Sequence, residues 1–150
     1  MKTKEYFQQI KNCDEKIKAK LRERAEIRDM LTSISVATNF EPVKHSTSGD
    51  RMGNAIAKLV DLENELNDDI DRFVDLKREI ENVFDDLDPV LALVLRNRYV
   101  YYMTWEQIAV ETGYSYRHVT RLHGKALVEA TKVMETWKKD GLECPTDHVL

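Results

Sequence analysis

The strongest constraint on the fold is an apolar residue at every seventh position of one segment. The five residues of this repeat are Leu59, Leu66, Phe73, Ile80 and Leu87. Such a repeat is typical of a helix that lays one face along another helix, as in a coiled coil. Flanking apolar residues widen this face beyond a strict seam: Ile56, Ile70 and Phe84 on one side, and Leu62, Leu76 and Val83 on the other. We therefore predict a long helix over residues 54–87.

A second long helix is predicted over residues 4–34, which contain neither Gly nor Pro. Apolar residues recur there at spacings mostly of three, four or seven, although Lys20 and Arg24 interrupt the stripe. The stripe consists of Tyr6, Ile10, Cys13, Ile17, Leu21, Ile27, Leu31 and Ile34. A helix of about 45 Å, at 1.5 Å per residue, needs another long helix beside it.

Residues 35–53 lose this periodicity and gather Ser, Thr, Asn, Pro and Gly, which predicts a linker. Residues 1–34 carry a net charge of +3 and residues 50–88 a net charge of −8, so the two helices attract each other. We expect an antiparallel hairpin whose spare apolar width serves self-association. A parallel coiled coil between two chains is the alternative that the sequence leaves open.

The segment after the hairpin should begin a new helix, because Asp88 can cap it and Pro89 suits its first position. The expected buried face of this helix consists of Val90, Leu91, Val94, Leu95 and Tyr99. Three aromatic residues follow and are expected to pack or to anchor through hydrogen bonds: Tyr101, Tyr102 and Trp105.

Residues 104–125 have the spacing of a helix-turn-helix. Thr104 and Ser115 can each cap a helix, and Gly113 between them can take the positive φ of a sharp turn. The inward positions are apolar or small on both helices: Ile108 and Ala109 on the first, and Val119, Leu122 and Ala126 on the second. The second helix should continue through Leu127, Ala130, Val133, Met134 and Trp137 and pack back on the hairpin.

Outward residues of this second helix suit contact with DNA, because they can donate hydrogen bonds to phosphates and to base edges in a major groove. The candidate DNA-binding residues are Ser115, Tyr116, Arg117, His118, Thr120, Arg121 and Lys125. Residues 89–139 carry a net charge of +4 although the whole chain carries −4. So small an excess predicts weak, salt-sensitive binding by one copy, and therefore a homo-oligomer or a protein partner. A helical hairpin that binds no nucleic acid is the alternative for this spacing.

Residues 88–127 resemble region four of bacterial sigma factors, most clearly in L-R-N-R-Y-V, T-W-E-Q-I-A and G-Y-S-Y-R-H-V-T-R-L-H. The whole chain is similar to small phage and prophage proteins of Gram-positive bacteria, some of which regulate late transcription. The resemblance implies a three- to four-helix domain that binds double-stranded DNA near RNA polymerase. Many sigma factors have Arg-Glu-Arg after the capping residue, whereas this chain has Tyr116, Arg117 and His118. The DNA sequence preference of the family therefore does not carry over.

These observations predict an all-α transcription regulator with three parts: a hairpin arm at 1–88 containing linker 35–53, a helix-turn-helix domain at 89–139, and a flexible tail at 140–150. The chain has no counterpart of the sigma region that melts promoters, so we expect an activator or accessory factor. Two other functions compete with this one. A small terminase subunit for DNA packaging also combines a helix-turn-helix with oligomerising helices, and an adaptor could bind RNA polymerase without binding DNA.

The sequence offers no catalytic or cofactor-binding motif, so we expect no enzyme. Cys144 and His148 do not make a zinc site, since a paired CxxC is absent. Cys13 and Cys144 are expected to be reduced thiols. No apolar run approaches the roughly 18 residues of a membrane span, and the first residues lack an apolar signal core, so we expect a cytoplasmic protein.

Overall fold

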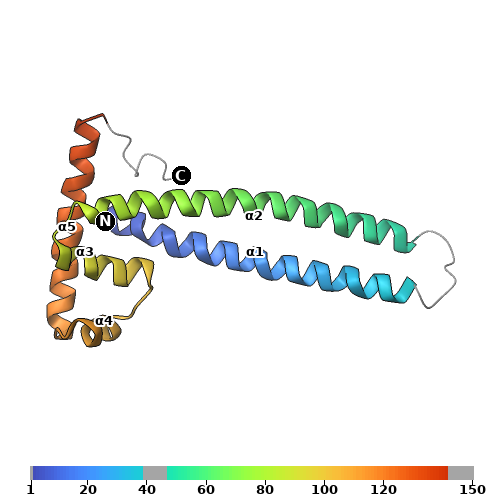
Figure 1. Ribbon diagram of the computed structural model, residues 1–150, viewed down its shortest axis with the longest axis horizontal. Helices are drawn as coiled ribbons and strands as arrows, with labels where there is room; N and C mark the ends of the chain where they lie inside the picture. Colours follow the sequence, from blue (N-terminus) through green and yellow to red (C-terminus); the bar gives the residue numbers. More distant parts are fainter. Residues whose placement is uncertain (1, 39–46, 142–150) are drawn as a thin grey trace. The chain divides into compact units, whose positions relative to one another are not determined.

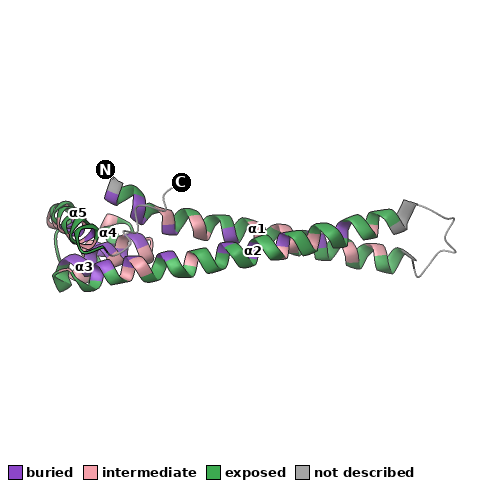
Figure 2. Ribbon diagram, turned by 90° about the horizontal axis from the view of Figure 1, so that it is seen from above, coloured by how far each residue is buried: buried purple, intermediate pink, exposed green. Residues whose placement is uncertain are grey.

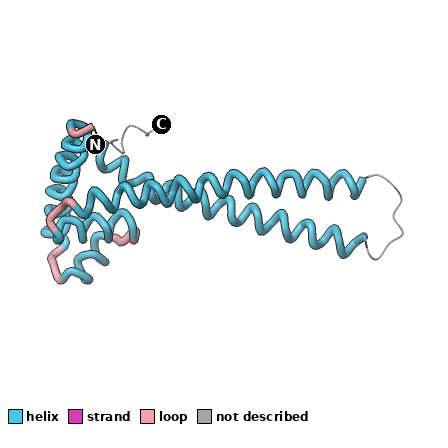
Figure 3. The backbone as a smooth tube through the Cα atoms, turned by 45° about the horizontal axis from the view of Figure 1, so that its top comes forward, coloured by secondary structure: helices cyan, strands magenta, loops and turns pink. Residues whose placement is uncertain are grey.

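The computed structural model describes residues 2–38 and 47–141, and every regular element in them is helical (Figure 3). Two long helices, α1 (Lys2–Thr38) and α2 (Thr47–Asp85), precede three shorter ones (Figure 1). These are α3 (Pro89–Leu95), α4 (Trp105–Thr112) and α5 (Tyr116–Lys139), with a π-helical turn η1 (Arg96–Val100) directly after α3. The predicted all-α class is confirmed. None of the described helices is long and apolar enough to cross a membrane.

Contacts between residues divide the chain into two compact units. The first, which we call the hairpin unit, is Asp14–Arg72, and the second, the globular unit, combines the residues up to Cys13 with those from Phe73 onward. The predicted domains followed the order of the chain, whereas these units do not. The reason is that the first turns of α1 and the last turns of α2 belong to the same apolar core as α3 and α5.

In the hairpin unit, α1 and α2 lie side by side and run in opposite directions (Figure 1). Their buried face is narrow, as the separate purple turns in Figure 2 show, and it contains Ile17, Ile27, Ala55, Leu62 and Leu66. Charged pairs between the helices border this face and follow the antiparallel order: Lys16 with Asp69, Lys20 with Glu65 and Asp69, and Arg28 with Glu63. The predicted antiparallel hairpin is thus observed within this unit.

Asp69 interrupts the apolar seam of α2 and is itself buried, at 9% exposure. Its carboxylate lies 2.6 Å from Nζ of Lys20 and 3.1 Å from Nζ of Lys16. The bond with Lys20 lowers the pKa of Asp69 below its usual range and raises the pKa of Lys20. Lys20 interrupts the apolar stripe of α1 because it forms an ion pair with Asp69 in the seam of α2.

The core of the globular unit forms around Phe7, which is fully buried. Its ring contacts Phe84 edge to face, with centroids 5.2 Å apart, and Tyr99 at 5.4 Å. The same cluster includes Ala126, Ala130 and Met134 of α5, so the later turns of α5 pack on the ends of both long helices within this unit, as expected. Polar contacts join the same segments: Thr3 to Thr131 at 2.6 Å and the Tyr6 hydroxyl to Glu79 at 3.1 Å.

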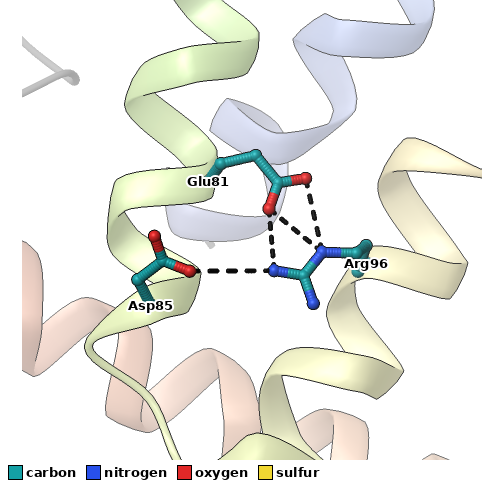
Figure 4. A network of polar contacts seen from close by, with 3 residues as sticks. All are labelled: Glu81, Asp85 and Arg96. Atoms are coloured by element: carbon teal, nitrogen blue, oxygen red, sulfur yellow. Dashed lines mark hydrogen bonds and ion pairs between the residues drawn. The ribbon is translucent and has the colours of Figure 1, made fainter.

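A π-helical turn carries Arg96 toward α2 (Figure 4). Its guanidinium donates from Nε and Nη2 to Oε2 of Glu81, at 3.0 and 2.7 Å, and lies 4.0 Å from Asp85. Paired donors of this kind hold an arginine in one orientation. Arg96 therefore fastens η1 to α2, and it is not a free cation for DNA.

Several expectations from the sequence are wrong in detail. The predicted linker 35–53 is too long, because α1 continues to Thr38 and α2 begins at Thr47; residues 39–46 lie outside the described residues, as do 142–150 of the predicted tail. Helix α2 also ends at Asp85, two residues before the predicted end at Leu87. Two residues expected to pack inside, Val90 and Tyr101, are exposed, and Ile56 and Ile70 are exposed as the expected spare apolar width of α2. Ile56 and Ile70 lie at the edge of the α2 seam, where one neighbouring helix does not cover them.

Candidate nucleic-acid interface

Helices α4 and α5 are joined by a tight turn at the position predicted from the sequence. Thr104 caps α4 by accepting a hydrogen bond from the Gln107 amide, and the Gln107 side chain accepts one from the Thr104 amide. Gly113 ends the helix with a left-handed φ of 71°, which favours glycine. Ser115 then caps α5 by accepting from the His118 amide at 3.2 Å.

Apolar contacts fix how α5 lies against its neighbours. Val119 and Ile108 are fully buried in one small cluster with Val94, and Leu122 packs against the same cluster. Ala126, on the same side of α5, is fully buried in the larger core. Because the buried residues lie at spacings of three and four, the opposite side of the first three turns of α5 faces away from the protein.

All seven candidate DNA-binding residues lie on or beside this outward side. Arg117, Arg121 and Lys125 are exposed and follow each other at four-residue spacing, so they form one stripe. Thr120 and Gly124 lie between them, and His118 borders them. We call these six residues the basic face. Tyr116, 50% exposed, and Ser115 stand at its N-terminal end. An open hollow of about 440 Å³ is lined by Ser115, Arg117, His118, Thr120 and Arg121.

Arg121 is held by a neighbour on the same helix. Its Nη2 lies 2.9 Å from Nδ1 of His118, which accepts the hydrogen bond when the imidazole is neutral. The ring of Tyr114 contacts His118 edge to face, with centroids 4.9 Å apart. Tyr114 and His118 thus limit the positions of the Arg121 guanidinium, which lowers the entropy cost of a contact with a bound molecule.

Thr120 is less able to donate a hydrogen bond to DNA than its position suggests. Its hydroxyl donates to the Arg117 carbonyl at 3.0 Å, and its side chain is half-buried. The donor is therefore already engaged, which leaves an oxygen that can accept and a methyl group. The structure places Thr120 within the basic face but makes it a weaker candidate than the two arginines.

The cations of the basic face have no carboxylate partner among the described residues, unlike several other cations of the chain. Arg28, Arg96 and Lys132 all form ion pairs, the last with Glu129 farther along α5. Within the described part of the chain, no ion pair involves Arg117, Arg121 or Lys125. Their charge is not neutralised locally, so it remains available to an anionic partner.

A buried polar cluster beneath the basic face was missed by the sequence analysis. His123, 9% exposed, lies with Nε2 at 2.8 Å from the Tyr99 hydroxyl and with its ring edge to face against Trp105 at 4.7 Å. Burial, helped by the charges of Lys4 and Arg98, lowers the pKa of His123 to about 4, so it is neutral at pH 7. Burial also raises the pKa of Tyr99 to about 12. The sequence does indicate that His123 is buried, because it follows the inward residue Val119 by four positions and so lies on the same face of the helix.

Gly124 is a second residue that the sequence analysis passed over. It lies inside α5, three residues after Arg121, and a Cβ added there would meet no atom within 4 Å. A glycine inside a helix costs about 1 kcal/mol relative to alanine, so its presence on the basic face calls for a compensating role.

The described residues contain no group of three or more His, Cys, Asp or Glu side chains that could hold a metal ion, and Cys144 and His148 lie outside them. Comparison of the sequence and structure with protein-family models, curated proteins and solved structures finds no match.

Proposed function

We propose that this protein is a sequence-specific DNA-binding transcription regulator that inserts the N-terminal turns of α5 into a major groove. One observation carries the proposal: the unpaired, exposed cations Arg117, Arg121 and Lys125 share one side of a capped helix whose other side is buried. Arginine side chains contact guanine edges and phosphates, and the short helix α4 lies next to α5, as in helix-turn-helix proteins.

The roles of the remaining candidates follow from their positions. Arg117 and Arg121 are the first choices for bases or phosphates, and Lys125, one turn later, for a phosphate. His118 acts mainly by orienting Arg121. Tyr116 presents an apolar ring that can contact a thymine methyl group, and the Ser115 end of the helix offers backbone amides to a phosphate.

The proposed partners are double-stranded DNA, a second copy of the chain and RNA polymerase. Three unpaired cations give one copy few phosphate contacts, so binding by a pair is favoured. Exposed apolar residues of α2 support self-association: Ile56 and Val60 are 46% and 51% exposed, and Ile70 is 38% exposed. The resemblance to region four of sigma factors supports a phage-encoded activator or accessory factor that works with polymerase in the cytoplasm.

Selection of bound duplexes from a random DNA pool, with and without RNA polymerase, tests the proposal directly. Titration of the selected duplex should then show that Arg117→Ala and Arg121→Ala each weaken binding by roughly ten- to a hundredfold. Lys132→Ala is the matched control, since Lys132 is an exposed cation of α5 that is paired with Glu129. Unchanged affinity and salt dependence in the double arginine variant would show that α5 does not read DNA.

A further inference from the structure

A small cavity lies between the first turns of α1 and the π-helical turn η1, within the globular unit. It has a volume of about 130 Å³ and is lined by Gln8, Lys11, Arg98, Tyr99 and Tyr102. At about 30 Å³ per water molecule in the liquid, this space equals roughly four waters, which suits one tetrahedral oxyanion. None of the five lining residues belongs to the basic face of α5.

The lining is positively charged and rich in hydrogen-bond donors. Lys11 and Arg98 contribute two cations and Gln8 an amide, while the Tyr99 hydroxyl is already bonded to His123; no carboxylate is found among the described residues that line the cavity. Lys4 and Arg98 are close enough to His123 to oppose its protonation, so the positive field extends across this side of the unit. An anion is the ligand that such a lining favours.

Arg98 is held in place before any ligand arrives. Its Nη1 donates to the Met103 carbonyl at 2.8 Å, and its guanidinium carbon lies 4.3 Å from the centre of the Trp105 ring. A guanidinium has five N–H donors, so one bond to a carbonyl leaves others for an anion. Orientation by the carbonyl and the ring reduces the entropy that binding would otherwise cost.

The wall formed by η1 and Tyr102 has an unusual backbone. Residues Arg96–Val100 form a π-helical turn, a rare conformation that occurs often at functional sites. Tyr102 has a φ of 56°, a left-handed conformation that costs about 1 kcal/mol or more for a residue other than glycine. Both features shape the side of the cavity that contains Arg98, Tyr99 and Tyr102.

From this combination we propose that the cavity binds a phosphate group, with Lys11 of α1 and Arg98 of η1 as its two cationic ligands. The phosphate can belong to the backbone of a duplex held by α5, in which case the inference rests on the proposed function, or it can be inorganic phosphate. In both cases the first turns of α1 take part in binding, beyond the α4–α5 pair.

Tryptophan fluorescence offers a direct readout, because Trp105 lies under the Arg98 guanidinium. In the full chain with Trp137→Phe, Trp105 is the remaining tryptophan. Sodium phosphate should change its emission saturably at constant ionic strength, whereas sodium chloride should not. Lys11→Ala should weaken this response roughly tenfold, as the loss of a charge-assisted hydrogen bond predicts, and Lys11→Arg should retain it. Lys77→Ala, an exposed lysine of α2, serves as the control.

The second arm measures duplex binding as a function of salt with the same variants. If the ligand is a backbone phosphate, Lys11→Ala makes the negative slope of log K against log[salt] shallower by about 1 per bound chain. An unchanged slope together with a saturable phosphate response identifies inorganic phosphate.

Equal responses to phosphate and chloride, with no effect of Lys11→Ala on the salt slope, would overturn the phosphate site. Wild-type protein that binds no duplex but still binds inorganic phosphate would refute the proposed function and leave the site intact. Thermal unfolding of each variant checks that Lys11, which is exposed, is not required for folding.

Discussion

At the scale of single residues, a substitution at Gly124 is expected to change stability and DNA binding in opposite directions. It is exposed and helical, and an added Cβ would meet no atom within 4 Å. Gly124→Ala should therefore raise the free energy of unfolding by about 1 kcal/mol. If DNA approaches the basic face closely, the same methyl group weakens duplex binding. Urea unfolding and a binding titration on one preparation measure both effects.

The control for this prediction is Gly53→Ala, because Gly53 is also helical and also has open space around its Cβ position. It should stabilise the protein by a similar amount and leave DNA affinity unchanged. If Gly124→Ala were to bind DNA as tightly as the wild type, close approach at that turn of α5 would be excluded.

His123 predicts how stability depends on pH. Its pKa in the folded protein is about 4, against an ordinary value near 6.5, so between these values the unfolded chain takes up a proton that the folded protein does not. The free energy of unfolding therefore falls as the pH is lowered from about 6.5 to 4, by up to about 3 kcal/mol. His123→Gln should remove this part of the pH dependence in urea titrations.

His118→Gln is the matched variant, since His118 also lies on α5 but is only half-buried. It should retain the loss of stability at low pH. Parallel curves for the wild type and His123→Gln across pH 4–7 would mean that burial does not keep His123 neutral.

Residue roles were only partly predictable from the sequence. Caps and turns depend on a few neighbouring residues, and so Thr104, Gly113 and Ser115 were identified correctly. The buried pair of Tyr99 and His123 depends on how α5 lies against η1, and their 24-residue separation carries no local signal. The same applies to Phe7 at the centre of the globular core, which lies beside the predicted stripe.

At the scale of helices, the seven-residue repeat predicted that α1 and α2 pair, but it did not predict their register. Register depends on which polar residues meet across the seam, and here Asp69 meets Lys20 and Lys16. Charged pairs inside a seam fix alignment at some cost in stability. The linker was predicted too long because Ser, Thr and Gly near Thr47 are as compatible with a helix start as with a loop.

Asp69→Ala should destabilise the hairpin unit by about 2 kcal/mol, because Lys20, whose side chain is 17% exposed, loses its closest partner. The combined change Asp69→Leu with Lys20→Met should restore or exceed wild-type stability, since an apolar pair avoids the desolvation cost. Urea unfolding of Asp69→Leu, of Lys20→Met and of the double variant measures the coupling energy between the two positions.

Arg28→Ala provides the comparison for a more exposed pair, because Arg28 and Glu63 are 56% and 38% exposed. Its effect should stay within about 0.5 kcal/mol. Additive effects at Asp69 and Lys20 would contradict the assignment of this ion pair as the polar contact that fixes the register.

At the scale of the whole molecule, charge limits what one copy can do. The chain carries a net charge of −4, and each copy presents three unpaired cations on the basic face. Each neutralised phosphate contributes about 0.9 to the magnitude of the negative slope of log K against log[salt], so the basic face of one copy should give a magnitude near 3 and the two basic faces of a pair 5 to 6. We expect the larger value.

The slope should fall to about 3 when self-association is removed. Exposed apolar residues of α2 are the surface to change, and glutamine at Ile56 and Ile70 removes their apolar area while keeping good helix formers. Sedimentation at the concentrations of the binding assay should show the double variant as a monomer with wild-type helix content. As a control, Asn64→Gln on an exposed part of α2 should change neither the oligomeric mass in sedimentation nor the salt slope of binding. A slope near 3 for the wild type, unchanged in the Ile56 and Ile70 variant, would mean that one copy binds alone and that self-association plays no part in DNA binding.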